Sequence, residues 1–423
     1  MMKLAIPVSP YPTFPRTREK GQTNRCASFK LTKKAKMINS KSIWAVLVLC
    51  VWIAACQTPP PPVEIKLPVG KTFPDFMVSK WAMLPDWATQ DLVASWPAML
   101  QSCHALRYKP VWLPICAAAA KLDSEDAAAQ RAFYETWFTP YQVFNPDGTD
   151  TGMITGYYEP LIKGSRKHSK RFAYPIYAPP DDMLDVDMGD LYPQFRGQGV
   201  RGRLQGKRVV PYFNRAEIDA GLAPALKGRE IFWVENPVEL FFLQIQGSGR
   251  IELEDGTRVK IGYAEQNGHS YASIGKKLID MGELKPEEAS MQGIKNWAEK
   301  NPERLLTLLG QNPSYVFFRE MPDSLSAPLG ALGVPLTNEY SIAVDQRTIP
   351  LGVPVFLATT QPNSPEPLNR LMFAQDTGGA IKGAVRADFF WGFGEIAAVR
   401  AGSMKQSGRM WVLFPRGGEP ALN

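Results

Sequence analysis

The hydrophobic pattern between residues 81 and 138 has the period of an α-helix. Leu92, Trp96 and Leu100 lie four residues apart, so they would share one face of a helix. The acidic run at 123–126 precedes the sequence AAAQRAFYETWF, and such side chains favour a helix N-terminus. We therefore predict that this part of the chain is helical.

After about residue 150 the pattern changes to short apolar runs separated by turns. The segments 250–254 and 257–261 alternate apolar and polar residues across an Asp-Gly dipeptide, which predicts a β-hairpin. Proline and acidic residues in first turns predict further helices between 270 and 310. Beyond residue 315 the apolar runs VFF, SIAV, PVFL, LMFA and MWVLF indicate strands of a compact barrel. The predicted fold class is mainly β with some helices.

An uncharged apolar stretch of 13 residues, IWAVLVLCVWIAA, covers positions 43–55 and is followed by Cys56. It is too short for a membrane-spanning helix of about 20 residues but suits the core of a signal peptide. The tetrapeptide IAAC resembles the lipobox of bacterial lipoproteins, in which the cysteine is acylated and becomes the first mature residue. We predict a signal peptide over 37–55 and interpret 1–36 as a non-native N-terminal extension. The alternative is a buried apolar segment with an incidental cysteine.

The lipobox resemblance also indicates where the protein works. Acyl chains on Cys56 would anchor it to a membrane surface without spanning the membrane. Gln57 differs from the aspartate that resembles an inner-membrane retention signal, so we expect an outer-membrane lipoprotein whose body faces the periplasm. Residues 56–74 contain the prolines at 59–62 and are expected to form an extended, lipid-anchored linker.

Processing at Cys56 leaves Cys103 and Cys116 as the only other cysteines of the mature chain. In an oxidising compartment, an even pair of this kind favours a disulfide, which contributes about 3 kcal/mol through loop closure. Two buried free thiols are the alternative.

The distribution of charge argues against nucleic acid as a partner. The 423 residues carry a net charge of +7. Residues 1–36 contain nine Lys or Arg and one acid, a net +8, so the rest of the chain sums to 7 − 8 = −1. The body is long enough for two or three domains, and it has no basic excess that would attract nucleic acid.

Carboxylates are the remaining candidates for catalytic groups, because the sequence lacks the motifs of the other common chemistries. The histidines His104, His168 and His269 have neither a histidine nor a cysteine at metal-ligand spacing, so we expect no metal. The glycine patterns fit neither a phosphate-binding loop nor a dinucleotide fingerprint, and the serine motif GxSxG does not occur. We therefore expect no cofactor.

Three aspartates lie among apolar residues and glycines near the C-terminus. Asp345 and Asp376 each end an apolar run, at the expected rim of a barrel, and Asp388 precedes the sequence FFWG. The neighbouring Gly378 and Gly379 would let the backbone approach a ligand closely. A carboxyl held among apolar groups has a raised pKa, as a general acid requires, although aspartates in such sequences also cap turns.

The pattern D-x-x-x-IPLG followed by A-x-DTGGAIKG-x-x-x-x-D-x-FWG resembles the 3D domain, and the whole body resembles the family of membrane-bound lytic murein transglycosylases A. The resemblance covers about residues 75–416. It implies a double-psi β-barrel domain built from 75–160 and 311–423, with a smaller β-barrel domain inserted over 161–310. Supporting segments are TGYYEP at 155–160, FFLQIQGSGRI at 241–251 and GYAEQNGHSYASIG at 262–275.

The resemblance implies cleavage of peptidoglycan. The family breaks the β-1,4 bond between N-acetylmuramic acid and N-acetylglucosamine without water and leaves 1,6-anhydromuramic ends. Asp388 matches the family's catalytic acid, and Asp376 and Asp345 match its two supporting aspartates. Asp388 would protonate the glycosidic oxygen and then accept the proton of the sugar's C6 hydroxyl as that oxygen attacks C1.

Further residues are expected to contact the glycan strands of peptidoglycan, the predicted partner. Aromatic rings could stack on sugars, although such rings more often belong to a core. Lysine or arginine, including Arg386, could meet the lactyl or peptide carboxylates, although a solvated charge is the simpler explanation. The candidate substrate-binding residues are Thr155, Tyr157, Tyr158, Gly378, Gly379, Lys382 and Trp391.

Two other functions are alternatives. An aspartic protease needs two carboxylates that share a proton, and the sequence Asp-Thr-Gly occurs at 150–152 and at 376–378. The first copy lacks the apolar strand that should precede it. A non-catalytic lipoprotein that binds peptidoglycan is the other alternative, because related barrels can bind polysaccharide without cutting it.

Overall fold

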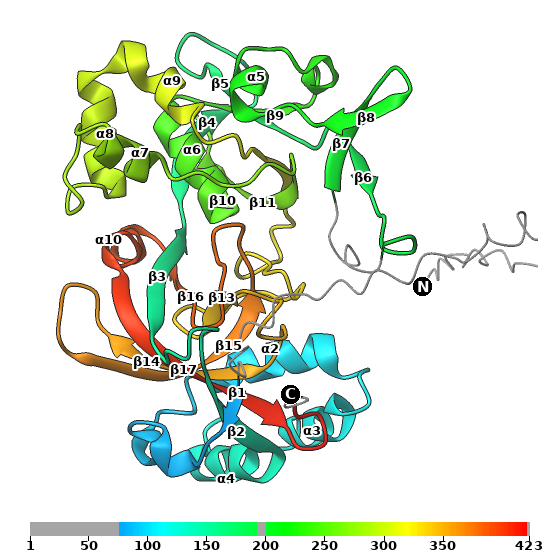
Figure 1. Cartoon of the computed structure of the whole chain (residues 1–423), viewed down its shortest axis with the longest axis vertical. Helices are drawn as coiled ribbons and strands as arrows, with labels where there is room; N and C mark the ends of the chain where they lie inside the picture. The colour runs from blue at the N-terminus through cyan, green and yellow to red at the C-terminus, as the bar shows by residue number, and fades with distance from the viewer. Residues whose placement is uncertain (1–75, 193–199, 421–423) are drawn as a thin grey trace, which may run out of the picture. The chain divides into compact units, whose positions relative to one another are not determined.

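A computed structural model describes residues 76–192 and 200–420 (Figure 1). The extension at 1–36, the predicted signal peptide, Cys56 and the linker up to residue 74 lie outside the described residues. In the described part of the chain, no helix combines the length and the hydropathy needed to cross a membrane.

One sheet of the molecule closes into a barrel. Its strands are β1 (Phe76–Val78), β2 (Phe138–Val143), β3 (Gly152–Glu159), β13 (Ser341–Val344), β14 (Pro354–Thr360), β15 (Pro367–Asp376), β16 (Ala387–Phe393) and β17 (Lys405–Pro415). The strands β17, β14, β15, β13, β16 and β3 pair in this order, and β17 pairs again with β3, which closes the ring. β2 and β1 extend the sheet outward from β17. The barrel therefore combines strands from the two ends of the described chain.

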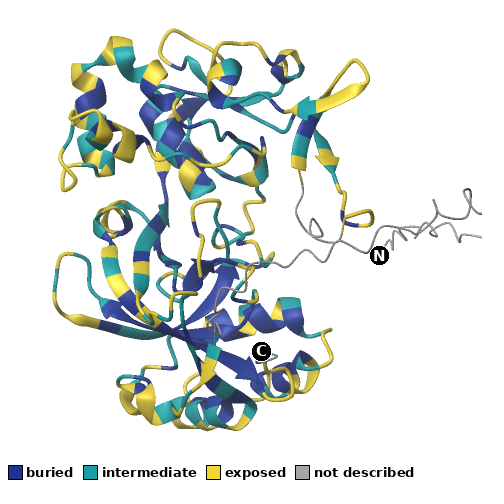
Figure 2. Ribbon diagram, viewed as in Figure 1, coloured by how far each residue is buried: buried dark blue, intermediate teal, exposed yellow. Residues whose placement is uncertain are grey.

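The barrel strands are apolar because both of their faces are covered. All residues of β13 are buried, and most of β14 and β15 are as well (Figure 2). Strands buried on both faces read as continuous apolar runs, which explains the sequences SIAV and PVFL. The core residues include Trp96, Tyr134, Phe138, Phe356 and Trp411, and they form one cluster from the inside of the barrel to the helices that cover it.

The helices expected between 81 and 138 are confirmed. Asp126 caps α4 by accepting a hydrogen bond from the backbone N–H of Ala129 at 2.9 Å. At the other end of the chain, one helix follows β16 and packs against it and against β3. The elements are η1 (Trp81–Met83), η2 (Trp87–Thr89), α2 (Trp96–Leu106), α3 (Trp112–Ala119), α4 (Ala127–Trp137) and α10 (Glu395–Ser403).

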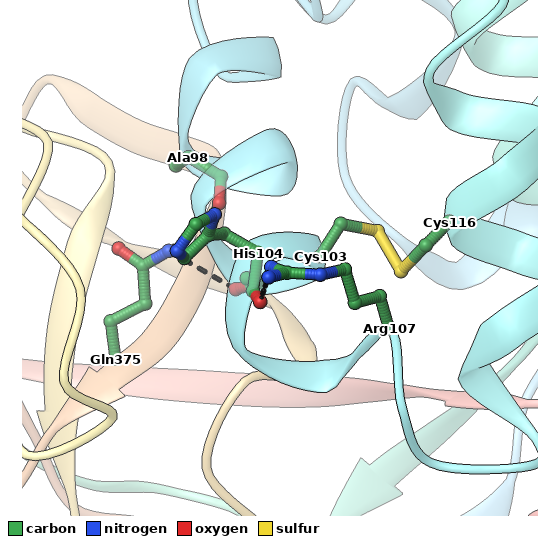
Figure 3. The surroundings of a disulfide bond; sticks show 7 residues. Ala98, Cys103, His104, Arg107, Cys116 and Gln375 are labelled. Atoms are coloured by element: carbon green, nitrogen blue, oxygen red, sulfur yellow. Dashed lines mark hydrogen bonds between the residues drawn. A yellow bond between two sulfur atoms is a disulfide. The ribbon is translucent and has the colours of Figure 1, made fainter. Parts of the chain in front are cut away.

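A disulfide joins Cys103 in α2 to Cys116 in α3, with the two Cα atoms 5.3 Å apart (Figure 3). The pairing predicted from the sequence is confirmed. The same helix α2 binds the end of β15, because the Gln375 side chain donates hydrogen bonds to Ala98 O at 2.7 Å and to Ser102 Oγ at 3.0 Å. The disulfide therefore braces the helix that holds the residue next to Asp376.

We expect this disulfide to be complete in the folded protein. A soluble form that begins after Cys56 should react with a thiol reagent only after unfolding and reduction, and then at both cysteines. Mass spectrometry of the labelled protein measures this, with the variant Cys103→Ser/Cys116→Ser as the unlabelled control. Labelling of the unfolded but unreduced protein would show that the thiols are free.

The chain between β3 and β13 forms a second sheet, with strand order β12, β11, β10, β4, β9, β5. These strands are β4 (Leu161–Ser165), β5 (Tyr174–Tyr177), β9 (Glu230–Val234), β10 (Ser248–Glu252), β11 (Arg258–Gln266) and β12 (Val316–Glu320). β10 and β11 form the predicted hairpin. Among the described strands β5 and β12 do not pair, so this sheet is not closed into the small barrel that the resemblance implied. Leu240 and Leu243 of a helix pack into its core instead.

This inserted segment is longer and more helical than expected. Because β12 pairs with β11, the insert extends to Glu320, past the boundary at 310. Its helices pack in two apolar clusters, one around Phe241 and Trp297 and one that includes Ile218 and Leu226. They are α5 (Arg215–Asp219), η4 (Pro224–Leu226), α6 (Pro237–Gln246), α7 (Ile274–Asp280), α8 (Met291–Lys300), η5 (Pro302–Arg304) and α9 (Leu305–Leu309), and β6 (Leu184–Val186), β7 (Val200–Gln205) and β8 (Arg208–Pro211) form a small third sheet.

Candidate active site

Asp388 lies on β16, directly opposite Thr155 on the parallel strand β3. The Thr155 hydroxyl donates a hydrogen bond to Asp388 Oδ1 at 2.6 Å, whereas Oδ2 accepts none from the described residues. Burial raises the pKa of Asp388, and the Thr155 hydrogen bond and the charge of Arg386 oppose this rise. The site therefore contains a carboxyl that holds a proton more readily than a solvated aspartate and has one oxygen free.

Asp376 lies beside Asp388 because β13 pairs with both of their strands. Ala343 is opposite Asp376 on one side of β13 and opposite Asp388 on the other. Backbone N–H groups of Ala331 and Thr377 each donate to Asp376 Oδ1 at 2.9 Å. Burial raises the pKa of Asp376 to about 6, and repulsion from Asp388 contributes to the rise. Two adjacent carboxyls with raised pKa values thus face the same space.

Tyr157 lines the cavity beside Asp388, and its hydroxyl supports Asp376, whereas its ring is buried. Its hydroxyl donates to Asp376 Oδ2 at 2.9 Å, and its buried ring packs against Phe390 with the ring centres 5.1 Å apart. Burial raises the pKa of this hydroxyl well above its ordinary value, and so does the charge of Asp376. Tyr157 therefore stays protonated and acts as a hydrogen-bond donor.

Trp391 also belongs to the core, so the expectation that it stacks on a sugar is corrected. Its side chain is buried, its indole N–H donates to Met404 Sδ at 3.3 Å, and its ring lies 4.4 Å from that of Phe389. The ring rests on Gly156, where a Cβ atom would come within 2.7 Å of the indole nitrogen. This close approach explains the glycine in the sequence TGYYEP.

Tyr158 alternates with Tyr157 along β3 and is half-buried. Its hydroxyl contacts Met291 Sδ at 3.8 Å, and its backbone N–H donates to Gln246 Oε1 at 3.0 Å. Both contacts are with the insert. Two cavities lie beside Asp388, and Tyr158 lines neither of them.

Asp345 is buried and remains ionised. The Arg347 side chain donates to it through Nε at 2.9 Å and Nη2 at 2.6 Å, and the backbone N–H of Gly383 donates at 2.9 Å. The hydrogen bonds from Arg347 hold the pKa of Asp345 well below its ordinary value. Asp345 therefore anchors the loop 377–386 through Gly383.

Two adjoining cavities lie beside Asp388. The inner cavity, about 230 Å³, is lined by both raised-pKa aspartates, and the outer cavity, about 590 Å³, is lined by Gly379, Lys382 and Lys405. Gly378 lines the inner cavity. The two cavities share Thr155, Tyr271, Ala380 and Arg386. The two cavities therefore adjoin each other at these four residues.

The insert contributes lining residues that were not among the candidates named from the sequence. Tyr271 lines both cavities and is 36% exposed, and Gln246 lines the inner one. Both residues lie in sequence segments that carry the family resemblance, which was the one available signal. Tyr271 is thus the exposed aromatic ring of the site.

The aspartic-protease alternative has no matching geometry. Asp150, of the first Asp-Thr-Gly sequence, accepts a hydrogen bond from the Gln142 side chain at 2.9 Å, and it lines neither cavity. The carboxyl next to Asp376 is Asp388 instead. Within 76–192 and 200–420, no three His, Cys, Asp or Glu side chains gather as metal ligands would.

Comparison with known proteins identifies the family. The MltA specific insert domain matches residues 153–319, and the 3D domain matches residues 340–414. The membrane-bound lytic murein transglycosylase A of Escherichia coli K12 is 38% identical over 281 residues, which are 64% of this chain and 68% of that protein. The chain belongs to this family of lytic murein transglycosylases.

Solved structures of the family agree with this assignment. The crystal structure of MltA from Neisseria gonorrhoeae is 41% identical, with a TM-score of 0.71, and the match covers 82% of this chain and 94% of that one. E. coli MltA with bound chitohexaose is 30% identical, with a TM-score of 0.59 and coverage of 77% and 90%. The second of these relatives binds an oligosaccharide.

Proposed function

We propose that this lytic transglycosylase cleaves the β-1,4 bond between N-acetylmuramic acid and N-acetylglucosamine in peptidoglycan and leaves 1,6-anhydromuramic ends. The observation that carries the proposal is Asp388, which lines the inner cavity, has a raised pKa and has an Oδ2 that accepts no hydrogen bond from the described residues. One carboxyl of this kind suffices for a reaction in which it gives a proton and later takes one back.

The two oxygens of Asp388 would have different tasks. Thr155 occupies Oδ1, so the proton of the neutral acid lies on Oδ2, which can give it to the glycosidic oxygen as the bond breaks. The resulting carboxylate then takes the proton of the C6 hydroxyl while that oxygen attacks C1. Because the nucleophile belongs to the same sugar, its effective concentration exceeds that of water. The products are the released N-acetylglucosamine end and the anhydro ring.

Asp376 would support this cycle by its charge and position. When it is ionised, repulsion between the two carboxylates favours the protonated form of Asp388. Tyr157 and the two backbone donors hold Asp376 in place for this role. Asp345 would act from farther away, by fixing through Gly383 the loop that carries Gly378 and Gly379.

The glycan would lie in the inner cavity and along the residues that this cavity shares with the outer one. Thr155, Gly378 and Gly379 would contact the sugars from the barrel, and Lys382 would meet a carboxylate of the strand. Tyr271 would offer its exposed ring from the insert, in place of Tyr157 and Trp391. Tyr158 would act indirectly through Met291 and Gln246.

For the architecture, we propose that the closed ring of six strands is a double-psi barrel. Its parallel pairs β13–β15 and β3–β16 within an otherwise antiparallel ring support this. The barrel domain would comprise residues 75–160 and those after Glu320, and the insert would comprise 161–320. Such insertions are tolerated where the ends of the inserted segment lie close together.

For the location, we propose an outer-membrane lipoprotein that is anchored through Cys56 and faces the periplasm. The sequence IAAC before a proline-rich linker supports the anchor, and the E. coli relative is named membrane-bound. An anchored enzyme of this kind would work beside the peptidoglycan layer. Metabolic labelling with a fatty acid tests the anchor, because Cys56→Ser should lose the label.

Mass spectrometry of the sugars released from purified peptidoglycan tests the proposed reaction. The soluble form that begins after Cys56 should release anhydromuropeptides. Reducing-end muropeptides would instead mean hydrolysis by water and would overturn the mechanism. Release of no product, with binding to peptidoglycan retained, would favour the non-catalytic wall-binding alternative.

We expect Asp376→Asn to stabilise the protein at neutral pH. The folded carboxyl has a pKa of about 6 against 3.8 for an ordinary aspartate, so folding disfavours its ionised form. The resulting penalty is absent below pH 3.8, grows as the pH rises to about 6, and is complete above that. A neutral asparagine removes the penalty, so the free energy of unfolding should rise by about 1–3 kcal/mol at pH 7.5. Urea denaturation at pH 4 and 7.5 measures this.

The same variant should lose activity at a lower pH than the wild type. Removal of the Asp376 charge lowers the pKa of Asp388, so the alkaline limb of the kcat profile should move toward acid. The exposed Asp190→Asn is the control for a general effect of losing one carboxylate. An unchanged pH profile would show that Asp376 has no such role.

A further inference from the structure

The outer cavity concentrates positive charge beside the catalytic carboxyl. Lys382, Arg386 and Lys405 line it, and its other lining residues include no aspartate or glutamate. The body of the chain beyond residue 36 sums to −1, so this local excess does not follow from the overall composition. The three cations come from the loop before β16 and from the first residue of β17.

The three cations differ in how they are paired. Arg386 donates to Thr155 Oγ1 at 2.8 Å and to the backbone carbonyl of Met153 at 3.1 Å, so it is held by the protein. Lys382 and Lys405 are exposed, and neither ammonium group has an ion pair or a hydrogen bond with the described residues. Among the described lysines, Lys276 and Lys295 are by contrast held in ion pairs, with Asp280 and Glu239, each at 2.9 Å. The two lysines at the cavity are therefore available to an anion.

The position of the cavity selects which anion can reach it. It shares Thr155 and Arg386 with the inner cavity, where Asp388 lies. In the proposed reaction the muramic sugar reacts at Asp388, and that sugar carries a lactyl ether with a peptide whose free groups include carboxylates. A volume of about 590 Å³, against about 230 Å³ for the inner cavity, accommodates more than a single sugar substituent.

We propose that the outer cavity is a subsite for the peptide stem of the reacting muramic residue, with Lys382 and Lys405 binding its carboxylates. This inference rests on the proposed function, because it places the muramic sugar at Asp388. The ligand class is an acidic peptide linked to a sugar, and charge-assisted hydrogen bonds from ammonium to carboxylate would hold it. The enzyme would then prefer strands that carry stems over naked glycan.

A comparison of two substrates tests the inference. The kcat/KM of the soluble form is measured on glycan strands with intact stems and on the same strands stripped of peptide by an amidase. We expect the ratio of the two values to fall about tenfold in Lys382→Gln/Lys405→Gln, mainly through KM, because two ion contacts are lost. Added salt should lower the wild-type ratio in the same direction, since these lysines are exposed.

Matched variants distinguish a local effect from a general one. Lys121→Gln/Lys170→Gln removes two exposed lysines elsewhere and should keep the wild-type ratio. Lys382→Arg/Lys405→Arg keeps the charges and should retain most of the preference. A wild-type ratio in the glutamine variant would overturn the inference.

Direct binding separates this inference from the proposed function. The dissociation constant of a soluble muropeptide, measured by calorimetry, should rise about tenfold in the glutamine double variant and stay unchanged in the Lys121/Lys170 control. This holds whether or not the protein cuts glycan. If the wild type releases no anhydro product, the proposed reaction fails, and an equal dissociation constant for wild type and double variant overturns the subsite.

Discussion

Replacement of Asp388 by asparagine should abolish the formation of anhydromuropeptides, with kcat reduced by about 10³-fold or more. An amide can neither give a proton to the glycosidic oxygen nor take one from the C6 hydroxyl, so both halves of the reaction lose their proton carrier. Asparagine has the shape of aspartate and can still accept the Thr155 hydrogen bond through its carbonyl oxygen. The measurement is the rate of product release from purified peptidoglycan, followed by mass spectrometry.

Two controls make this result specific. Asp150→Asn changes the other Asp-Thr-Gly aspartate, which lies outside both cavities, and should keep wild-type activity. Binding of Asp388→Asn to peptidoglycan should persist, which shows that the site is still formed. If Asp388→Asn retained more than about a tenth of the wild-type rate, Asp388 would not be the acid.

Loss of Arg250 should destabilise the protein by about 3–5 kcal/mol, because it leaves a buried carboxylate without its partner. Glu159, at the end of β3, is 2% exposed, and it accepts hydrogen bonds from Arg250 Nε at 3.0 Å and Nη2 at 2.8 Å. Arg250 belongs to the insert and also stacks on Phe393 of the barrel, with its guanidinium carbon 3.8 Å from the ring centre. Arg250→Met should therefore lower the urea midpoint markedly.

The adjacent strand provides a matched control. Arg258 forms an ion pair with Glu252 at 3.1 Å, but both side chains are largely or partly exposed. Arg258→Met should therefore cost no more than about 0.5 kcal/mol. The double variant Glu159→Gln/Arg250→Met should recover part of the loss, since it removes the unpaired charge as well. Equal effects of Arg250→Met and Arg258→Met would mean that burial of Glu159 does not govern the stability of this junction.

Local features of the fold were predictable because local chemistry causes them. The helix that Asp126 caps and the hairpin around Asp255-Gly256 both depend on residues a few positions apart, and both are confirmed. The disulfide was predictable from the number of mature cysteines and the expected compartment. The boundary of the insert was not, because β12 belongs to it through a pairing with β11 that no local signal marks.

The residues of the site also divide into those that the sequence predicts and contacts that only the fold creates. The sequence by itself identified the three candidate aspartates, since they stand in a specific pattern with glycines and apolar runs. Only the tertiary structure decided what surrounds them. Thr155 meets Asp388 across a separation of 233 residues, and Tyr157 meets Asp376 across 219, contacts that no periodicity encodes.

The aromatic residues show most clearly why the sequence could not predict these contacts. Tyr157 and Tyr158 are neighbours of the same type, yet one is buried against Asp376 and the other faces the insert. Side chains alternate between the two faces of a strand, so the pairing register of β3 with β16 determines which tyrosine points inward. The sequence determined the candidate residues and the family, whereas the strand register and the contact with the insert determined that Tyr157 bonds to Asp376 and that Tyr271 lines both cavities.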